Sequence, residues 1–183
     1  MLGIVGLGRR AMCATIPCRP RYVGMDTLNK LASSIPNRRY PHHSLPDAMK
    51  GDSLLILTVC TKNRAPVLAN DYVHQVLRDL WQNDQHWRVG VYVIMPDHIH
   101  LIVTLAHSNS VPLERWISWW KRESTLRAKQ YEVRWQKTFW DRRIRGEENY
   151  AAKVAYIRNN PVRQHLVLKP PEWRFQGEIY RIG

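Results

Sequence analysis

The stretch Met95-Pro96-Asp97-His98-Ile99-His100-Leu101-Ile102-Val103 decides how this chain folds. Pro96-Asp97 is typical of a tight turn, and the residues after it alternate as in a strand. Successive side chains of a strand point to opposite faces, so His98 and His100 share one face, roughly 7 Å apart along the chain. The other face carries aliphatic side chains, those of Ile99, Leu101 and Val103. Two imidazoles held on one face can bind one metal ion.

Two further strands and a helix are predicted before this stretch. Residues 53–61 are a short apolar run rich in β-formers, and residues 88–95 are a second one. Asn70 or Asp71 can cap a helix between them. That helix has apolar positions at helical spacing: Val73, Val76, Leu77 and Leu80. Because only a short turn separates residues 88–95 from residues 98–105, these two strands should form a hairpin.

Two helices and one strand are predicted in the second half of the chain. Val111-Pro112 favours a helix start, and helical spacing then relates Leu113, Trp116, Ile117, Trp120 and Ser124. Residues 138–145 are predicted as a strand. Gly146-Glu147-Glu148 opens a last helix that reaches about Asn159, and Pro161 ends it. This order of elements favours an α+β fold in which the helices pack on one face of an antiparallel sheet.

The composition favours a polyanionic partner. The chain has 183 residues, and 28 Lys and Arg stand against 15 Asp and Glu, a net charge of +13. Such an excess is typical of nucleic-acid-binding proteins, with an ordinary basic protein as the alternative. The three cysteines show neither metal-ligand spacing nor a disulfide framework: Cys13, Cys18 and Cys60. No apolar run approaches the roughly 20 residues of a membrane span, so we expect a cytoplasmic, nucleoid-associated protein.

The first part of the chain differs from the rest. Residues 1–37 show little periodicity and are rich in Gly, Pro, Arg and Ser, which favours a poorly ordered basic extension before a domain of residues 38–183. Met25 is an alternative start to Met1. Arg38 and Arg39, at the boundary of the domain, are candidates for contacts to DNA phosphates.

A basic and aromatic stretch occupies residues 114–145. It holds ten Lys and Arg against four Asp and Glu, and five Trp are interleaved with them. Basic side chains follow a nucleic-acid backbone, and aromatic rings stack on unpaired bases, at about 1–3 kcal/mol per base. Trp116 and Trp120 share a helix face and are expected in the core, whereas Trp119 lies off that face. The candidate DNA contacts in this stretch are Trp119, Lys121, Arg122, Arg142, Arg143 and Arg145.

Three segments together resemble one protein family. They are His98-Ile99-His100, Phe139-Trp140-Asp141-Arg142-Arg143-Ile144-Arg145 and Tyr156-Ile157-Arg158-Asn159-Asn160-Pro161-Val162. In this combination they resemble the HUH-type tyrosine transposases, and most of all the REP-associated subgroup related to transposases of simple insertion sequences. The resemblance implies a ferredoxin-like, RNA-recognition-motif-like fold. It also implies a single-strand DNA endonuclease and strand transferase, monomeric or homodimeric, that nicks hairpin-bearing, REP-like palindromic DNA.

The resemblance implies roles for four residues. His98 and His100 would be ligands of Mg²⁺ or Mn²⁺, and Asn160 would be the third ligand, at a place that the family fills with Gln, Glu or Asn. Tyr156 would attack the phosphate and carry a 5′ phosphotyrosine. The spacing itself puts Tyr156 and Asn160 one helical turn apart, so the two side chains can share a face.

Several alternatives stay open at this point. Tyr150 is a rival nucleophile, although its spacing with Val154 and Ile157 favours packing, and Asn159 competes with its neighbour as the third ligand. A non-catalytic nucleic-acid-binding module on the same fold is the second possibility, but it would not need both histidines and Tyr156. A metal-dependent hydrolase of small phosphates is the third, and the net charge of +13 argues against it.

Overall fold

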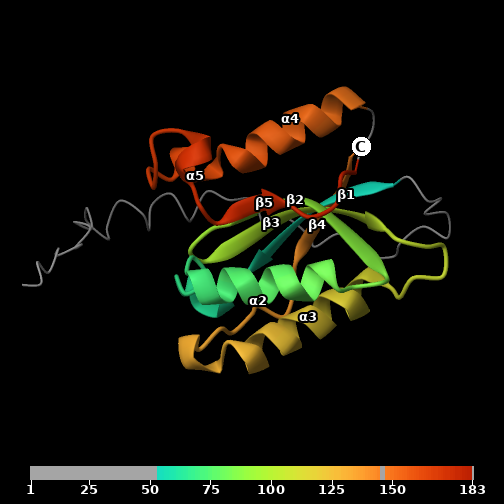
Figure 1. The fold of residues 1–183 in the computed structure, drawn as a ribbon, viewed down its shortest axis with the longest axis horizontal. Coiled ribbons are helices and arrows are strands. Elements are labelled where there is room, and N and C mark those ends of the chain that lie inside the picture. Colours follow the sequence, from blue (N-terminus) through green and yellow to red (C-terminus); the bar gives the residue numbers. More distant parts are fainter. Residues whose placement is uncertain (1–52, 145–146, 183) are drawn as a thin grey trace, which may run out of the picture. The chain divides into compact units, whose positions relative to one another are not determined.

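Five antiparallel strands form an open sheet in the computed structural model, which describes residues 53–144 and 147–182 (Figure 1). The strand order is β4-β1-β3-β2-β5. The strands are β1 (Leu54–Cys60), β2 (Trp87–Ile94), β3 (His98–Leu105), β4 (Trp140–Ile144) and β5 (Gln176–Glu178). The first four confirm the predicted strands. The sequence does not predict β5, because Gln-Gly-Glu has neither alternation nor β-forming side chains.

The three predicted helices are also confirmed. They are α2 (Asp71–Gln82), α3 (Leu113–Arg127) and α4 (Glu147–Arg158). Asn70 caps α2, since its side-chain oxygen accepts a hydrogen bond of 2.9 Å from the amide of Val73. A short fourth helix, α5 (Asn160–Arg163), follows α4. Short 3₁₀ segments lie at Lys62–Arg64, Lys129–Tyr131 and Pro170–Glu172.

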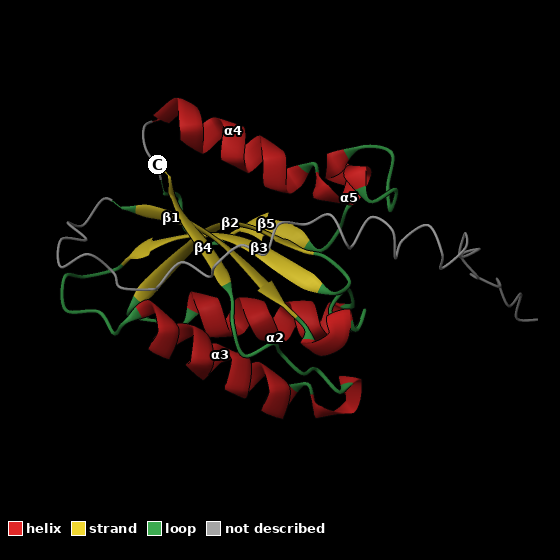
Figure 2. Ribbon diagram, turned by 180° about the vertical axis from the view of Figure 1, so that it is seen from behind, coloured by secondary structure: helices red, strands yellow, loops and turns green. Residues whose placement is uncertain are grey.

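The predicted α+β fold with an antiparallel sheet is confirmed, but helices cover both faces of the sheet rather than one (Figure 1, Figure 2). The layer of α2 and α3 buries one face, where Ile99, Leu101 and Val103 lie. α4 lies against the other face, over a second and smaller core that includes Ile56 and Ile102. The physical reason is that the strands carry apolar side chains on both sides, and each apolar face must be covered to be removed from water.

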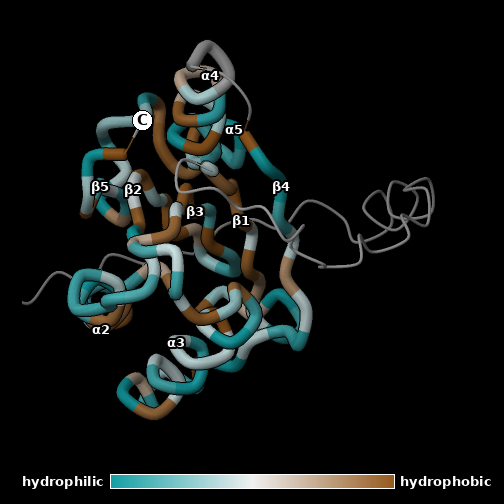
Figure 3. Tube along the Cα trace, turned by 90° about the vertical axis from the view of Figure 1, so that its right-hand side faces the viewer, coloured by the Kyte–Doolittle hydropathy of each residue, from teal (hydrophilic) through white to brown (hydrophobic). Residues whose placement is uncertain are grey.

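The central strand β3 carries both histidines. It pairs with β1 on one side, where Thr58 is opposite His100, and with β2 on the other side, where Val93 is opposite His100. The side chains of His98 and His100 lie on the same face as Ile102, which α4 covers. In Figure 3 the hydrophobic positions are concentrated on the strands between α4 and the layer of α2 and α3. The histidines thus occupy a polar end of an otherwise apolar face.

Some predictions lie outside the described residues. They are the extension 1–37, the alternative start at Met25 and the proposed DNA contacts Arg38, Arg39 and Arg145. Within the described part of the chain, no helix is both long enough and apolar enough to cross a membrane.

Candidate active site

The two predicted metal ligands lie side by side on the face of the sheet that α4 covers. The ring centroids of His98 and His100 are 4.9 Å apart, with an interplanar angle of 88°. Both residues are buried, with 8% and 7% of their surface exposed. The structure therefore confirms that the two imidazoles share one face and can reach a common point.

An acidic residue orients His98. The Nδ1 atom of His98 donates a hydrogen bond of 2.6 Å to Oδ1 of Asp97, and Oδ2 of Asp97 pairs with Nε of Arg64 at 2.8 Å. Burial alone would raise the pKa of Asp97, but the hydrogen bond from His98 and the charges of His98 and Arg64 bring this pKa below its usual value. Asp97 is therefore an ionised acceptor. It holds the proton of His98 at Nδ1 and leaves Nε2 as the ligand atom.

A threonine occupies the corresponding place beside His100. Oγ1 of Thr58, on β1, is 3.0 Å from Nδ1 of His100. Burial, followed by the charges of His98, Arg64 and Arg163, lowers the pKa of His100 to about 3. The imidazole is therefore neutral near pH 7, as a metal ligand must be. With Nδ1 engaged by Thr58, Nε2 is again the atom left for a ligand role.

Tyr156 is exposed at the end of α4, close to the histidines. Its ring centroid is 6.3 Å from that of His100, and 47% of its surface is exposed. The rival Tyr150 is partly buried and packs against the core beneath α4. Burial, and then the negative charge of Glu178, raises the pKa of Tyr150, which makes its phenolate harder to form. The geometry therefore favours Tyr156 as the nucleophile.

Asn160 closes the end of α4 rather than continuing it. The helix ends at Arg158, which confirms the predicted end near Asn159, and Asn160 then begins the unpredicted short helix α5 with Pro161 in its first turn. Pro161 is accommodated because the first turn of a helix does not need its amide. Nδ2 of Asn160 donates to the carbonyls of Tyr156 at 3.1 Å and Ile157 at 3.4 Å. The buried amide is thereby fixed with Oδ1 as its acceptor.

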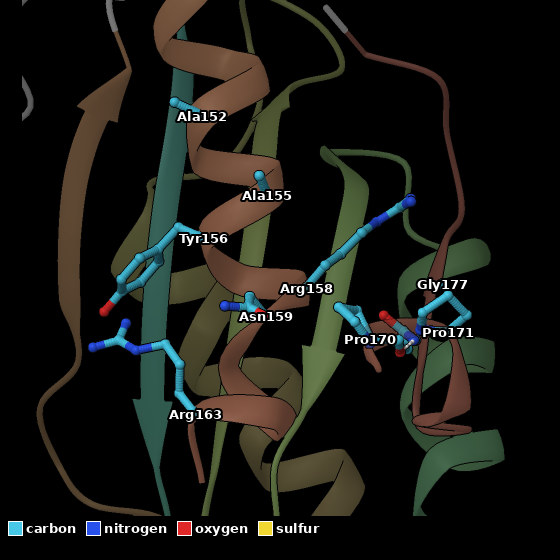
Figure 4. Close-up of a pocket in the computed structure, with 10 residues that line it drawn as sticks. Ala152, Ala155, Tyr156, Arg158, Asn159, Arg163, Pro170, Pro171 and Gly177 are labelled. Atoms are coloured by element: carbon cyan, nitrogen blue, oxygen red, sulfur yellow. Dashed lines mark hydrogen bonds between the residues drawn. The ribbon is translucent and has the colours of Figure 1, made fainter. Parts of the chain in front are cut away.

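Arg163 adds a positive charge next to Tyr156. Its guanidinium carbon lies 5.0 Å from the centroid of the Tyr156 ring, a cation–π contact. In Figure 4 both side chains extend from α4 and α5 over β1, whereas Arg158 points away from them. Both residues line a hollow of about 820 Å³ beside α4 and α5. An exposed phenol and an exposed cation thus line one hollow, and the phenol ring lies next to that of His100.

The donor atoms present fit a hard or borderline divalent ion. Two imidazoles and one amide oxygen are the predicted set, from His98, His100 and Asn160. Within the described residues no group of three or more His, Cys, Asp and Glu could hold a metal, so a site here depends on the amide or on the substrate for further oxygens. Mg²⁺ and Mn²⁺ accept such oxygen ligands, and Mn²⁺ accepts imidazole more readily.

Lys121 is not placed as the prediction of a DNA contact requires. It is 9% exposed, and its Nζ donates to the carbonyl of Gln136 at 2.9 Å and to that of Thr138 at 3.4 Å. Burial lowers the pKa of Lys121 to about 8, partly offset by Cys60. This lysine links α3 to the segment before β4, and its ammonium group is occupied by hydrogen bonds within the protein.

The other predicted DNA contacts divide between the two faces. Trp119 and Arg122 are exposed on α3, in the layer away from the histidines. Arg142 is opposite Ile56, so it lies on the histidine face, whereas Arg143 lies on the other face and donates to Oγ of Ser53. The predictions from sequence missed Asp97, Thr58 and Arg163 as parts of the site. Of these, only Asp97 could be found from the sequence, because it is adjacent to His98.

Comparisons with known proteins identify the family of this chain. Residues 54–160 match the family of IS200-like transposases. A REP-associated tyrosine transposase of Escherichia coli K12 is 28% identical over 130 residues, which are 69% of this chain and 76% of the relative. A solved REP-associated tyrosine transposase bound to a REP hairpin has a TM-score of 0.58 and 28% identity, over 76% of this chain and 79% of its own. The matched residues include both histidines, Tyr156 and Asn160, and this chain belongs to the family of IS200-like transposases.

Proposed function

We propose that this transposase is a metal-dependent single-strand DNA endonuclease and strand transferase that nicks hairpin-bearing DNA through a 5′ phosphotyrosine. The observation that carries the proposal is the exposed Tyr156 next to a buried histidine pair in which both Nδ1 atoms are engaged. A non-catalytic binding module has no need of such an arrangement. Family membership supports cleavage of DNA as the type of reaction.

Tyr156 supplies the nucleophile. Its phenol oxygen attacks the phosphorus and loses its proton to solvent, while the bond from phosphorus to the 3′ oxygen breaks and that oxygen takes up a proton. The 5′ phosphate stays on Tyr156, and the other end leaves with a free 3′ hydroxyl. Because the phosphotyrosine keeps a phosphodiester bond, a 3′ hydroxyl of another strand can reverse the step without a nucleotide cofactor.

The surrounding residues orient the attacked phosphate and neutralise its charge. A divalent ion held by His98, His100 and Asn160 would offset the charge of the attacked phosphate. Arg163 is the second source of positive charge, since a guanidinium can donate two hydrogen bonds to one phosphate. Its contact with the Tyr156 ring keeps it within reach of both the phenol and the bound phosphate.

The similar protein and the charge of the chain both support one class of substrate. The solved relative is bound to a REP hairpin, and this chain carries a net charge of +13. A hairpin with unpaired flanks offers a backbone that can bend over the exposed end of α4. We therefore infer a REP-like palindromic hairpin with flanking single strand as the substrate.

A covalent-adduct assay tests the proposal. A hairpin labelled at its 3′ end is incubated with Mn²⁺, and the adduct is detected after denaturing electrophoresis, because the label then stays on the fragment joined to protein. Tyr156→Phe removes one hydroxyl and should bind the hairpin normally while forming no adduct. Tyr150→Phe is the matched control and should form it. Hairpin binding by the unaltered protein with no adduct under any metal would support the binding module instead.

A further inference from the structure

Two tryptophans are exposed to the same extent but lie on opposite sides of the molecule. Trp119 is 40% exposed on α3, and Trp140 is 39% exposed on β4. The other tryptophans of the basic stretch are used for packing, and Trp120 contacts both Trp116 and Trp135. Trp140 belongs to neither hydrophobic core. Only an exposed indole on the histidine face can meet DNA at the active site.

The register of the sheet places Trp140 on the histidine face. Thr58 is opposite Trp140 on one side and opposite His100 on the other. Residues directly opposite each other in antiparallel strands share a face, and the hydroxyl of Thr58 does reach His100. Ile144, which has the same parity as Trp140 on β4, lies in the core beneath α4 and confirms the assignment.

Trp140 lies at a distance that suits a neighbouring nucleotide. Two strand-to-strand steps separate the Cα atoms of Trp140 and His100, about 10 Å in all. In Figure 4 Tyr156 extends over β1 toward the side on which β4 runs. Since β4 is an edge strand, no described strand covers its outer side. A single strand that crosses Tyr156 in the direction of β4 would therefore reach Trp140 within one or two nucleotides.

We propose that Trp140 is a stacking platform for one unpaired base next to the scissile phosphate, with Arg142 as the phosphate contact beside it. Arg142 is exposed and lies two residues further along β4 on the same face. An indole accepts any base on its ring, and a neighbouring cation holds the backbone. The inference rests on the proposed function, and it replaces Trp119 with Trp140 as the stacking residue at the site of cleavage.

Abasic substrates combined with substitutions test the platform. A hairpin series carries one abasic position at a time in the unpaired flanks, and affinity is measured without divalent metal. Trp140→Ala should weaken binding of the intact substrate about 5- to 150-fold, the range expected for one stacked base. One abasic position should cause a similar loss in the unaltered protein but no further loss in Trp140→Ala. Trp140→Phe should retain part of the affinity, and Trp119→Ala, the control with equal exposure, should show the same abasic loss at that position as the unaltered protein.

The outcomes separate this inference from the proposed function. Trp140→Ala at saturating DNA should still form the Tyr156 adduct. If the abasic pattern holds but the unaltered protein forms no adduct, the platform stands and the proposed chemistry fails. If Trp140→Ala shows the same abasic pattern as the unaltered protein, the platform is wrong, whatever the adduct assay shows. If Trp140→Ala fails to fold, Trp140→Phe takes its place in the same comparison. Its smaller ring should reduce the loss of hairpin affinity that the abasic position causes, and an unreduced loss would overturn the platform.

Discussion

Oδ1 of Asp97 accepts a hydrogen bond of 2.6 Å from Nδ1 of His98, the next residue in the chain. Neighbouring residues of a regular strand point to opposite faces, so this contact needs Asp97 to lie in the turn before β3 rather than in the strand. Arg64 holds the other carboxylate oxygen at 2.8 Å. The turn therefore does more than reverse the chain, because it fixes which nitrogen of His98 faces the site.

Loss of the Asp97 carboxylate should weaken metal binding. Partners of this kind typically contribute about 10- to 100-fold to metal affinity or activity. For Asp97→Ala we expect the Mn²⁺ concentration at half-maximal cleavage to rise by about that factor. Asp97→Asn should be intermediate, because its amide oxygen still accepts from His98. Asp79→Ala on α2 is the control, since that carboxylate bonds Gln75 on the other layer. An unchanged Mn²⁺ requirement in Asp97→Ala would rule out the orienting role.

Removing either histidine, or the metal, should stop cleavage and spare binding. Most affinity for nucleic acid comes from phosphate and base contacts, which His98→Ala and His100→Ala leave in place. We expect no adduct from either variant and hairpin affinity close to that of the unaltered protein. His86→Ala, an exposed histidine outside the site, is the control and should cleave normally. EDTA should reproduce the effect of both substitutions, and full cleavage in chelator would show that no metal is needed.

Arg163 should affect the rate of attack more than the affinity for DNA. Loss of one donor to a charged transition state typically costs about 10²- to 10³-fold in rate. Adduct formation by Arg163→Gln at saturating hairpin should slow by about that factor, and Arg163→Lys should recover part of the rate through its charge. Arg158→Gln is the matched control, because Arg158 lines the same hollow but points away from Tyr156 (Figure 4). Equal slowing in both glutamine variants would mean that only net charge matters.

Local patterns predict the parts of the fold that depend on neighbours in sequence. The alternation after Asp97 predicts β3 and the shared face of its histidines, and the helical spacing of Leu113, Trp116 and Ile117 predicts the buried side of α3. The second layer of helices does not follow from such patterns, since alternation tells which residues share a face but not which helix covers it.

The site is predictable only where its residues are close in sequence. Thr58 and Trp140 join His100 through strand pairing across the sheet, and sequence spacing carries no information on that register. Arg163 meets Tyr156 because the chain turns between α4 and α5, a break that a uniform helix would not contain. The basic stretch predicts Lys121 as a DNA contact, but this residue lies four positions after Ile117 and so extends the buried stripe of α3.

Lys121 should be needed for stability rather than for DNA. Lys121→Met leaves the carbonyls of Gln136 and Thr138 without their donor, which should lower the free energy of unfolding by about 1–3 kcal/mol. Hairpin affinity, measured where the variant is folded, should be unchanged. Arg122→Met is the neighbouring surface control, with a side chain 76% exposed, and should leave stability unchanged. A loss of affinity specific to Lys121→Met in the folded protein would restore its role in DNA binding.

The pH dependence of stability should identify the same lysine. Burial lowers the pKa of Lys121 to about 8 in the folded protein, from 10.5 for the free side chain. Between these values the unfolded chain binds the proton and the folded protein does not, so the free energy of unfolding gains a positive slope with pH. The stability difference between the unaltered protein and Lys121→Met should therefore widen from pH 8 to about pH 10, in denaturant unfolding at each pH. A constant difference would contradict a buried, titrating Lys121.

The form of the substrate should decide whether DNA is cut. Tyr156 is on the last turn of α4, and Trp140 needs an unpaired base, so the strand must bend and expose its bases at the site. A perfect duplex offers neither, and unpairing even one base costs a few kcal/mol. Hairpins with unpaired flanks should therefore be nicked, and the same sequence as a blunt duplex should not.

Binding should also weaken steeply with salt, since each neutralised phosphate of a single strand contributes about −0.7 to the slope of log affinity against log salt concentration. Arg142→Gln should reduce that slope by about one such increment, whereas Glu132→Gln, which removes an exposed negative charge outside β4, should not reduce it. Equal nicking of duplex and hairpin, or a slope that Arg142→Gln leaves unchanged, would show that the strand does not follow β4 past Tyr156.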